Sequence, residues 1–189
     1  MHTILRPSNW HGNQTVADAI REIVFGAEDG TVQNMALIAG MVGAGLSNHV
    51  IVIAGLVNAI AGVLSMSMGT YLSSKAERDA RLATVDGPTV DPRTFSPGRD
   101  AAVMAAAYAA GALVPIAPFT VGFVDPHRAL QVAVAATGLA LFALGAGKAI
   151  VSGQRIVPSG LEMLLLAAGA GFAGYLLGVA AGAVFGIET

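Results

Sequence analysis

Long apolar stretches separated by short polar segments divide the chain into five parts, each long enough to cross a bilayer as a helix. This pattern predicts an all-α integral membrane protein with one five-helix transmembrane domain at residues 15–189, after a polar, cytosolic segment at 1–14. The expected helices are 15–43, 48–80, 97–121, 127–151 and 159–186, with a cytosolic loop at 82–98.

Signals at the helix ends support these boundaries. Thr15 with Asp18, and Ser159 with Glu162, have the spacing of a capping box, so we expect the first and fifth helices to begin there. Asp125 is a suitable N-cap for the fourth helix. At about 1.5 Å per residue, the first two helices exceed a hydrocarbon layer of about 30 Å. We therefore expect an antiparallel hairpin whose polar ends both extend into the cytosol.

The composition excludes several classes of protein. Hydrophobic residues make up 54% of the chain and charged residues 12%, whereas a soluble domain carries about a quarter charged residues. The absence of cysteine excludes disulfides and thiolate metal sites, and a net charge of -2 without a dense basic run argues against nucleic-acid binding. The sequence contains no H-E-x-x-H motif, phosphate-binding loop or nucleophile elbow. We therefore expect neither an enzyme nor a permanently bound cofactor.

Lysine and arginine are enriched on the cytosolic side of membrane proteins. Of the 10 basic residues, only Arg128 lies towards the other side of the predicted membrane. The others lie towards the side of the N-terminus: Arg6, Arg21, Lys75, Arg78, Arg81, Arg93, Arg99, Lys148 and Arg155. We therefore expect a cytosolic N-terminus and a C-terminus outside the cytosol or in an organelle lumen. The cytoplasmic membrane is the favoured location, with a vacuolar-type membrane as the alternative.

Acidic and amide side chains form a stripe along the first predicted helix. Asp18, Glu22, Asp29 and Gln33 follow spacings of 4, 7 and 4, which keeps them on one face. Asp29 is expected inside the hydrocarbon layer, where a carboxylate is costly unless it is paired, protonated or bound to a cation. The alternatives are a packing role for Asp29, and a solvated first turn that complements the helix dipole for Asp18 and Glu22.

A matching stripe on the second predicted helix consists of Met66, Thr70, Ser73 and Glu77. Counted from the intervening turn, Met66 has a depth similar to that of Asp29, so the two side chains can face each other. A thioether beside a carboxylate is a suitable ligand for a first-row transition metal. The alternative is that Met66 only fills the core.

Two further patterns predict contacts between helices. Gly174, Gly178 and Gly182 recur at every fourth position, which allows close helix packing either within the chain or between two copies. Asn34 and Asn58 are polar residues within apolar helices, and we expect them to form interhelical hydrogen bonds.

The motifs taken together resemble the vacuolar iron transporter family, which includes yeast calcium-sensitive-complementing transporters and plant nodulin-like relatives. The sequences that carry this resemblance lie at residues 21–30, 54–69, 111–118, 144–148 and 159–163. The resemblance implies a five-helix homodimeric transporter that exchanges cytosolic ferrous iron, and sometimes manganese, for protons. It also implies a path between the subunits, along the first two helices.

Carried over by position, Asp29 and Met66 match the family's intramembrane ion-site residues, while Asp18 and Glu22 match acidic residues near its cytosolic entrance. There are two departures from the family pattern. The segment 82–99 replaces a glutamate-rich metal-binding domain, and Thr70 stands where the family commonly has glutamate.

The resulting hypothesis is a divalent cation transporter that exports Fe²⁺ or Mn²⁺ from the cytosol by proton antiport. Asp29, Met66, Asp18 and Glu22 are the main candidate metal ligands, and the weaker candidates are Gln33, Thr70 and Glu77. Its expected partners are a second copy bound through transmembrane helices, the lipid bilayer and protons as the coupling ion. The alternatives are a passive cation channel and a non-transporting membrane partner subunit.

Overall fold

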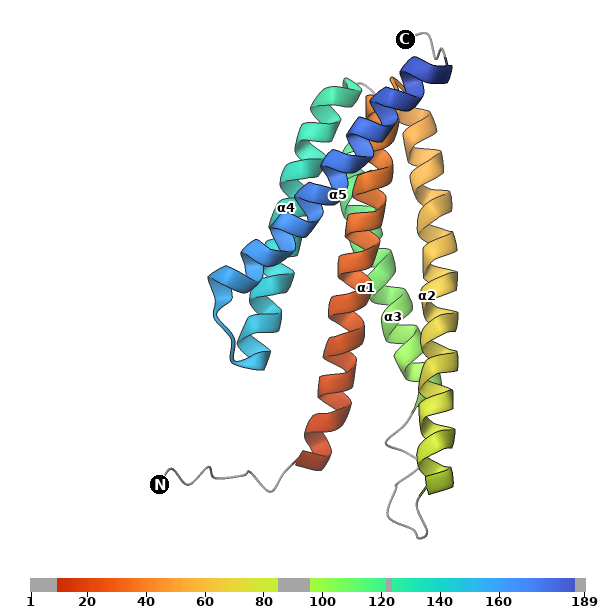
Figure 1. Cartoon of the computed structure of the whole chain (residues 1–189), viewed down its shortest axis with the longest axis vertical. Coiled ribbons are helices and arrows are strands. Elements are labelled where there is room, and N and C mark those ends of the chain that lie inside the picture. Colours follow the sequence, from red (N-terminus) through yellow and green to blue (C-terminus); the bar gives the residue numbers. More distant parts are fainter. Residues whose placement is uncertain (1–9, 85–95, 122–123, 186–189) are drawn as a thin grey trace.

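The computed structural model describes residues 10–84, 96–121 and 124–185, without the side chains of residues 10–18, 81 and 84. These residues form five α-helices and one short 3-10 helix (Figure 1). The elements are α1 Trp10–Gly43, α2 Asn48–Thr84, α3 Pro97–Ile116, η2 Ala117–Thr120, α4 Pro126–Ser152 and α5 Ile156–Phe185. The predicted all-α fold class is thus confirmed.

Four of the described helices are long and apolar enough to cross a membrane, namely α2, α3 continued by η2, α4 and α5. The chain is therefore a multi-pass membrane protein. The 34-residue α1 is not among the four, although it lies lengthwise beside the other helices (Figure 1). Polar residues within it, including Glu28, Asp29 and Gln33, reduce its hydropathy. A fifth crossing by α1 stays a prediction.

Two helices begin earlier than the sequence predicts. α1 begins at Trp10, so Thr15 lies inside the helix, and α5 begins at Ile156, three residues before Ser159. The Ser159 hydroxyl does not cap α5 but donates a hydrogen bond to the Gly145 carbonyl oxygen of α4, at 3.0 Å. Pro158 is tolerated because the first turn of a helix does not use its backbone N–H groups. The predicted capping box at Ser159 is wrong.

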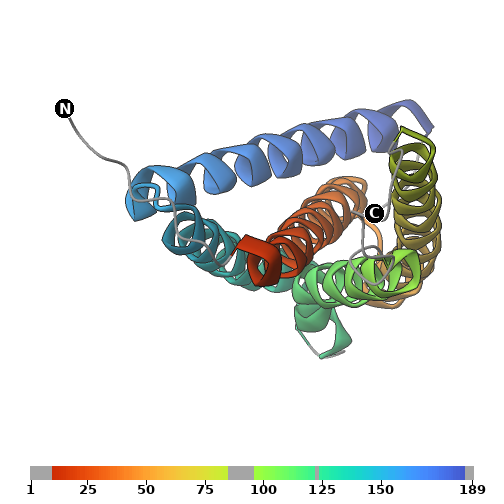
Figure 2. The same cartoon turned by 90° about the horizontal axis from the view of Figure 1, so that it is seen from below.

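α3 packs between α1 and α2, so the first two helices are not the closely paired hairpin that we expected. α3 has extensive contacts with both, whereas α1 and α2 contact each other far less (Figure 2). Glycines permit this approach: a Cβ at Gly30 of α1 would overlap the Tyr108 carbonyl, and one at Gly111 of α3 would overlap the Ala27 carbonyl. Close backbone contact therefore fixes α3 against α1.

The glycines of α5 pack within the chain. A Cβ at Gly178 would overlap the Gly40 carbonyl of α1, and one at Gly174 would overlap the Ala36 carbonyl. Gly182 lies next to Ala44, directly after the end of α1. Of the two interpretations of this stripe, the structure supports close packing within the chain.

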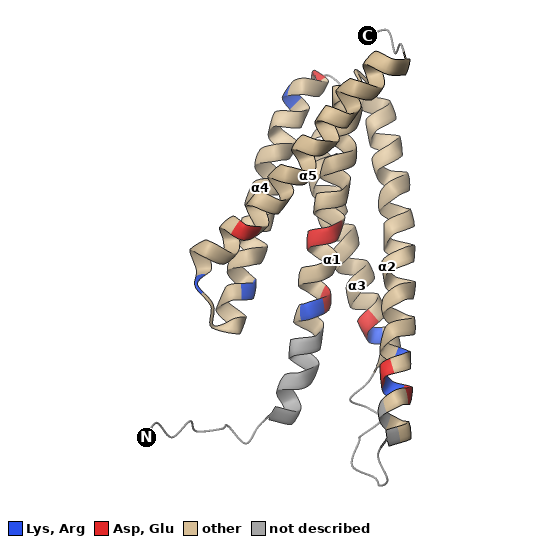
Figure 3. Ribbon diagram, viewed as in Figure 1, with Lys and Arg blue, Asp and Glu red and all other residues tan. Residues whose placement is uncertain are grey.

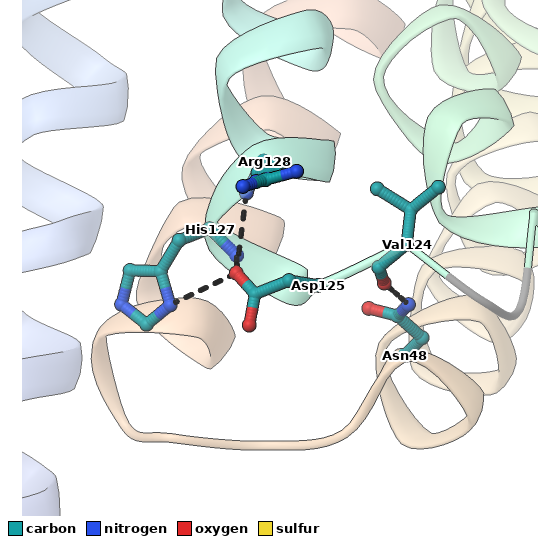
Figure 4. Close-up of polar contacts among 5 residues, drawn as sticks. All are labelled: Asn48, Val124, Asp125, His127 and Arg128. Carbon is teal, nitrogen blue, oxygen red and sulfur yellow. Dashed lines mark hydrogen bonds and ion pairs between the residues drawn. The ribbon is translucent and has the colours of Figure 1, made fainter.

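Side chains fix the connections at the end of the bundle where α2 and α4 begin (Figure 4). The Asn48 side-chain amide donates a 2.6 Å hydrogen bond to the Val124 carbonyl oxygen. Asp125 caps α4 as expected, since its Oδ1 accepts hydrogen bonds from the backbone N–H of His127, at 2.9 Å, and of Arg128, at 3.4 Å.

Candidate metal path

Charged residues gather at the end of the bundle where α1 begins, α2 ends and α3 begins, which we call the charged end (Figure 3). The described residues there are Arg21, Glu22, Lys75, Glu77, Arg78, Asp79, Arg99 and Asp100. α1 and α2 extend farther in this direction than the connection between α4 and α5 (Figure 1). Glu28 and Asp29 stand apart from this group, nearer the middle of α1.

A cavity of about 680 Å³ lies between α1, α2 and α3 at the charged end. It brings together four of the predicted site residues: Glu22 from α1, and Met66, Thr70 and Glu77 from α2. The remaining lining residues are Arg21, Phe25, Ser65, Gly69, Ser73, Ser74 and Met104. Carboxylates, hydroxyls and thioethers therefore share one space, which suits a divalent transition metal better than an anion.

Glu22 is a buried carboxylate, only 4% exposed, and it is paired with its neighbour. Arg21 donates to Glu22 Oε1 through Nη2 at 2.6 Å and through Nε at 3.0 Å. Because α1 begins at Trp10, neither Asp18 nor Glu22 lies in its first turn, so the helix-dipole interpretation of these residues is wrong. Asp18 lies within α1, but its side chain falls outside the described part of the chain.

Asp29 lies one helical turn beyond Phe25 on the same face of α1 and is not among the residues that line the cavity. It is half-buried and close enough to Tyr108 of α3 for the two side chains to interact electrostatically. The Tyr108 hydroxyl donates a hydrogen bond to Oε1 of Gln33. The structure thus places Tyr108 of α3 on Gln33 and near Asp29, while the pairing of Asp29 with Met66 stays a prediction.

The two predicted intramembrane asparagines meet beyond this point. Asn58 Nδ2 of α2 donates to Asn34 Oδ1 of α1 at 3.3 Å, and Asn34 Nδ2 donates to the Gly30 carbonyl oxygen at 3.1 Å. The expected interhelical hydrogen bond is confirmed. Polar side chains therefore continue from the cavity, past Asp29, to the pair Asn34–Asn58.

In the described part of the chain, no three His, Asp or Glu side chains lie close enough together to hold a metal ion. Carboxylate and imidazole ligands alone therefore do not form a metal site there. An ion in this region would also need thioether, hydroxyl or amide ligands. Such a mixed set is compatible with an ion that passes through, since fewer charged ligands bind it less tightly.

Comparison with known proteins identifies the family. A model of the VIT family matches residues 20–89 and 82–179, which together make up most of the chain. The chain belongs to the VIT family. Membership confirms the resemblance found in the sequence and makes the chain a membrane transporter rather than an enzyme.

Several named relatives of this VIT family chain come from plants. Vacuolar iron transporter homolog 1 of Oryza sativa subsp. japonica is 33% identical over 172 residues, which cover 85% of this chain and 73% of that protein. Homolog 2 from the same rice is 30% identical over 159 residues, covering 79% of this chain and 83% of the relative. Vacuolar iron transporter 1 of Tulipa gesneriana is 25% identical, covering 86% and 87% respectively.

The comparisons also bear on the connection after α2. The match to the VIT family falls into two pieces that overlap at residues 82–89. The alignment to the tulip protein spans 218 positions, more than the 189 residues of this chain. That relative therefore has positions without a counterpart here, in agreement with a short member of the VIT family. Asp86 and Asp91, the acids of this connection, lie outside the described residues.

Proposed function

We propose that the chain exports a divalent metal cation, Fe²⁺ or Mn²⁺, from the cytosol in exchange for protons. The observation that carries this proposal is the row of polar side chains from the cavity at the charged end, past Asp29, to the pair Asn34–Asn58. The relatives that are named as iron transporters favour iron among the divalent cations.

The cavity would be the cytosolic entrance. Glu22 and Glu77 attract cations, and Met66 and Thr70 offer ligands that can replace part of the ion's hydration shell. In the family pattern Thr70 is commonly a glutamate, so this entrance has one carboxylate fewer. Weaker capture of cations at the entrance follows from this difference.

Asp29 would hold the partly dehydrated ion, with Gln33 as a further oxygen ligand. A charged carboxylate within a membrane span is energetically unfavourable unless a cation or a proton neutralises it. Exchange of the metal ion for a proton keeps Asp29 neutralised throughout. Protonation from the far side would release the ion there. This order of events couples proton entry to metal exit.

This orientation requires α1 to cross the membrane and the charged end to face the cytosol. The basic residues at that end, with Arg128 at the other, support the orientation through the positive-inside rule. The positions of the helix ends also support an odd number of crossings, because α1 begins and α5 ends at opposite ends of the bundle (Figure 1).

We also propose a homodimer through α2. A row of large apolar side chains on α2 is exposed in the single chain: Ile53, Leu56, Val57, Ile60, Leu64 and Met68. Over its most apolar stretch, α2 is as little buried within the single chain as α5 is. α2 also supplies most of the residues that line the cavity. A second copy packed on this face would cover large apolar side chains that the single chain leaves exposed.

Reconstitution into proteoliposomes tests the transport function. We expect wild-type vesicles to take up Fe²⁺ or Mn²⁺ when a pH gradient is imposed, and to move protons in the opposite direction. Metal flux that follows only the metal gradient, without proton movement, would favour the passive channel instead. Vesicles that take up neither ion would contradict the proposal.

A further inference from the structure

Tyr108 joins the two helices that carry the candidate path. It belongs to α3 and is 0% exposed. Its hydroxyl donates to Oε1 of Gln33 in α1, and the edge of its ring lies against Gly62 in α2. A Cβ at Gly62 would overlap the ring and its hydroxyl, so only glycine leaves room for the tyrosine here.

The ring of Tyr108 occupies the space that separates the cavity from the polar pair beyond it. Met104, one turn earlier on α3, lines the cavity. Asn58, one turn beyond Gly62 on α2, bonds to Asn34. Tyr108 bridges Gln33 of α1 and Gly62 of α2 at a level between the two, so an ion that moves along these helices from the cavity to the pair would meet its ring.

The hydroxyl of Tyr108 competes for an oxygen atom that an ion would use. Asp29 lies one turn before Gln33 on the same face of α1, near Tyr108. Divalent ions such as Mn²⁺ favour carboxylate and carbonyl oxygen ligands, so an ion at Asp29 would attract Oε1 of Gln33. An amide oxygen that coordinates a cation is a poorer acceptor for the phenol hydroxyl.

We propose that Tyr108 is a positioning residue that acts as a latch on the path. Its hydrogen bond to Gln33 holds the ring between α1 and α2, and an ion bound at Asp29 opens the path by taking over the Gln33 oxygen. This inference rests on the proposed transport function. It adds that the path opens only when an ion occupies the site at Asp29.

The substitution Tyr108→Phe tests the latch, because it keeps the ring against Gly62 and removes only the hydroxyl. In proteoliposomes we expect the KM for Mn²⁺ to fall about two- to tenfold, the range that corresponds to losing one competing hydrogen bond. Proton leak in metal-free vesicles should rise by a similar factor. Tyr175→Phe, a partly buried tyrosine on α5, is the matched control and should change neither quantity.

A second variant removes the same bond from its other partner. Gln33→Leu should raise the metal-free proton leak as Tyr108→Phe does, but should raise the KM for Mn²⁺ because an ion ligand is lost. An unchanged or higher KM in Tyr108→Phe, or an unchanged leak in both variants, would overturn the latch. Wild-type vesicles without Mn²⁺ or Fe²⁺ uptake would instead overturn the transport function itself.

Discussion

At the scale of single residues, the candidate path consists of polar groups with defined neighbours. Glu22 is bound by Arg21, Gln33 accepts the Tyr108 hydroxyl, and Asn34 accepts the Asn58 amide. Each of these bonds would have to loosen or be shared when an ion passes. Met66 and Met104 add a different chemistry to the cavity, since a thioether is a softer potential ligand than the carboxylate and hydroxyl oxygens beside it.

Met66→Leu should weaken metal uptake without unfolding the protein. Leucine has nearly the same volume, and such substitutions usually cost less than about 1.5 kcal/mol of stability. We expect the KM for Fe²⁺ to rise about tenfold, equivalent to about 1.4 kcal/mol of lost binding. Met163→Leu is the control, because Met163 is buried between α4 and α5 away from the cavity. Equal KM values in the two variants would exclude Met66 as a ligand.

At the scale of elements, the position of α3 decides the geometry of the site. Small residues on α1 and α3 let their backbones touch, and α3 thereby places Tyr108 and Met104 next to the stripes of α1 and α2. The other side of α1 is fixed by α5 through the contacts of Gly174 and Gly178. α1 is therefore held from two sides while it carries Asp29.

Gly178→Ala tests the packing of α5 on α1. The added Cβ would overlap the Gly40 carbonyl, and overpacking of this kind costs about 1–3 kcal/mol. We expect the midpoint of thermal unfolding in detergent to fall by several degrees. Gly147→Ala on α4 meets no atom within 4 Å and should leave the midpoint unchanged or slightly higher. Equal midpoints for both variants would contradict the close α1–α5 contact.

The sequence predicts the residues of the path better than their partners. Helical periodicity is a local property, so spacing alone groups Glu22 on α1 and Met66, Thr70 and Glu77 on α2 into the stripes that line the cavity. The sequence does not point to Tyr108, because this residue is isolated in an Ala-rich apolar helix for which a structural role is expected. Its role depends on α3 lying between α1 and α2, which is a tertiary feature.

At the scale of the whole molecule, the chain has one end rich in charge, a long and mainly apolar middle that contains Glu28 and Asp29, and an exposed apolar row on α2. This arrangement fits a bilayer protein whose α1 and α2 reach beyond the membrane. The alignment to the tulip relative contains positions that this chain lacks, in agreement with a short member of the VIT family.

Cysteine cross-linking tests the proposed dimer, since the sequence contains no cysteine and each introduced one is unique. Ile60→Cys on the exposed row of α2 should form a disulfide-linked dimer when membranes are oxidised. Leu139→Cys on α4, which is 73% exposed against 62% for Ile60, should not. Cross-linking of both, or of Leu139→Cys alone, would contradict a specific interface on α2.

The most direct test of the central claim is metal uptake by Asp29→Asn in proteoliposomes with an imposed pH gradient. We expect Fe²⁺ and Mn²⁺ uptake to fall by about tenfold or more, because an amide cannot provide the charge that offsets dehydration of the ion in a low-dielectric span. Glu28→Gln, a change of the adjacent acid, should retain uptake. Normal, proton-coupled uptake by Asp29→Asn would contradict the path described here.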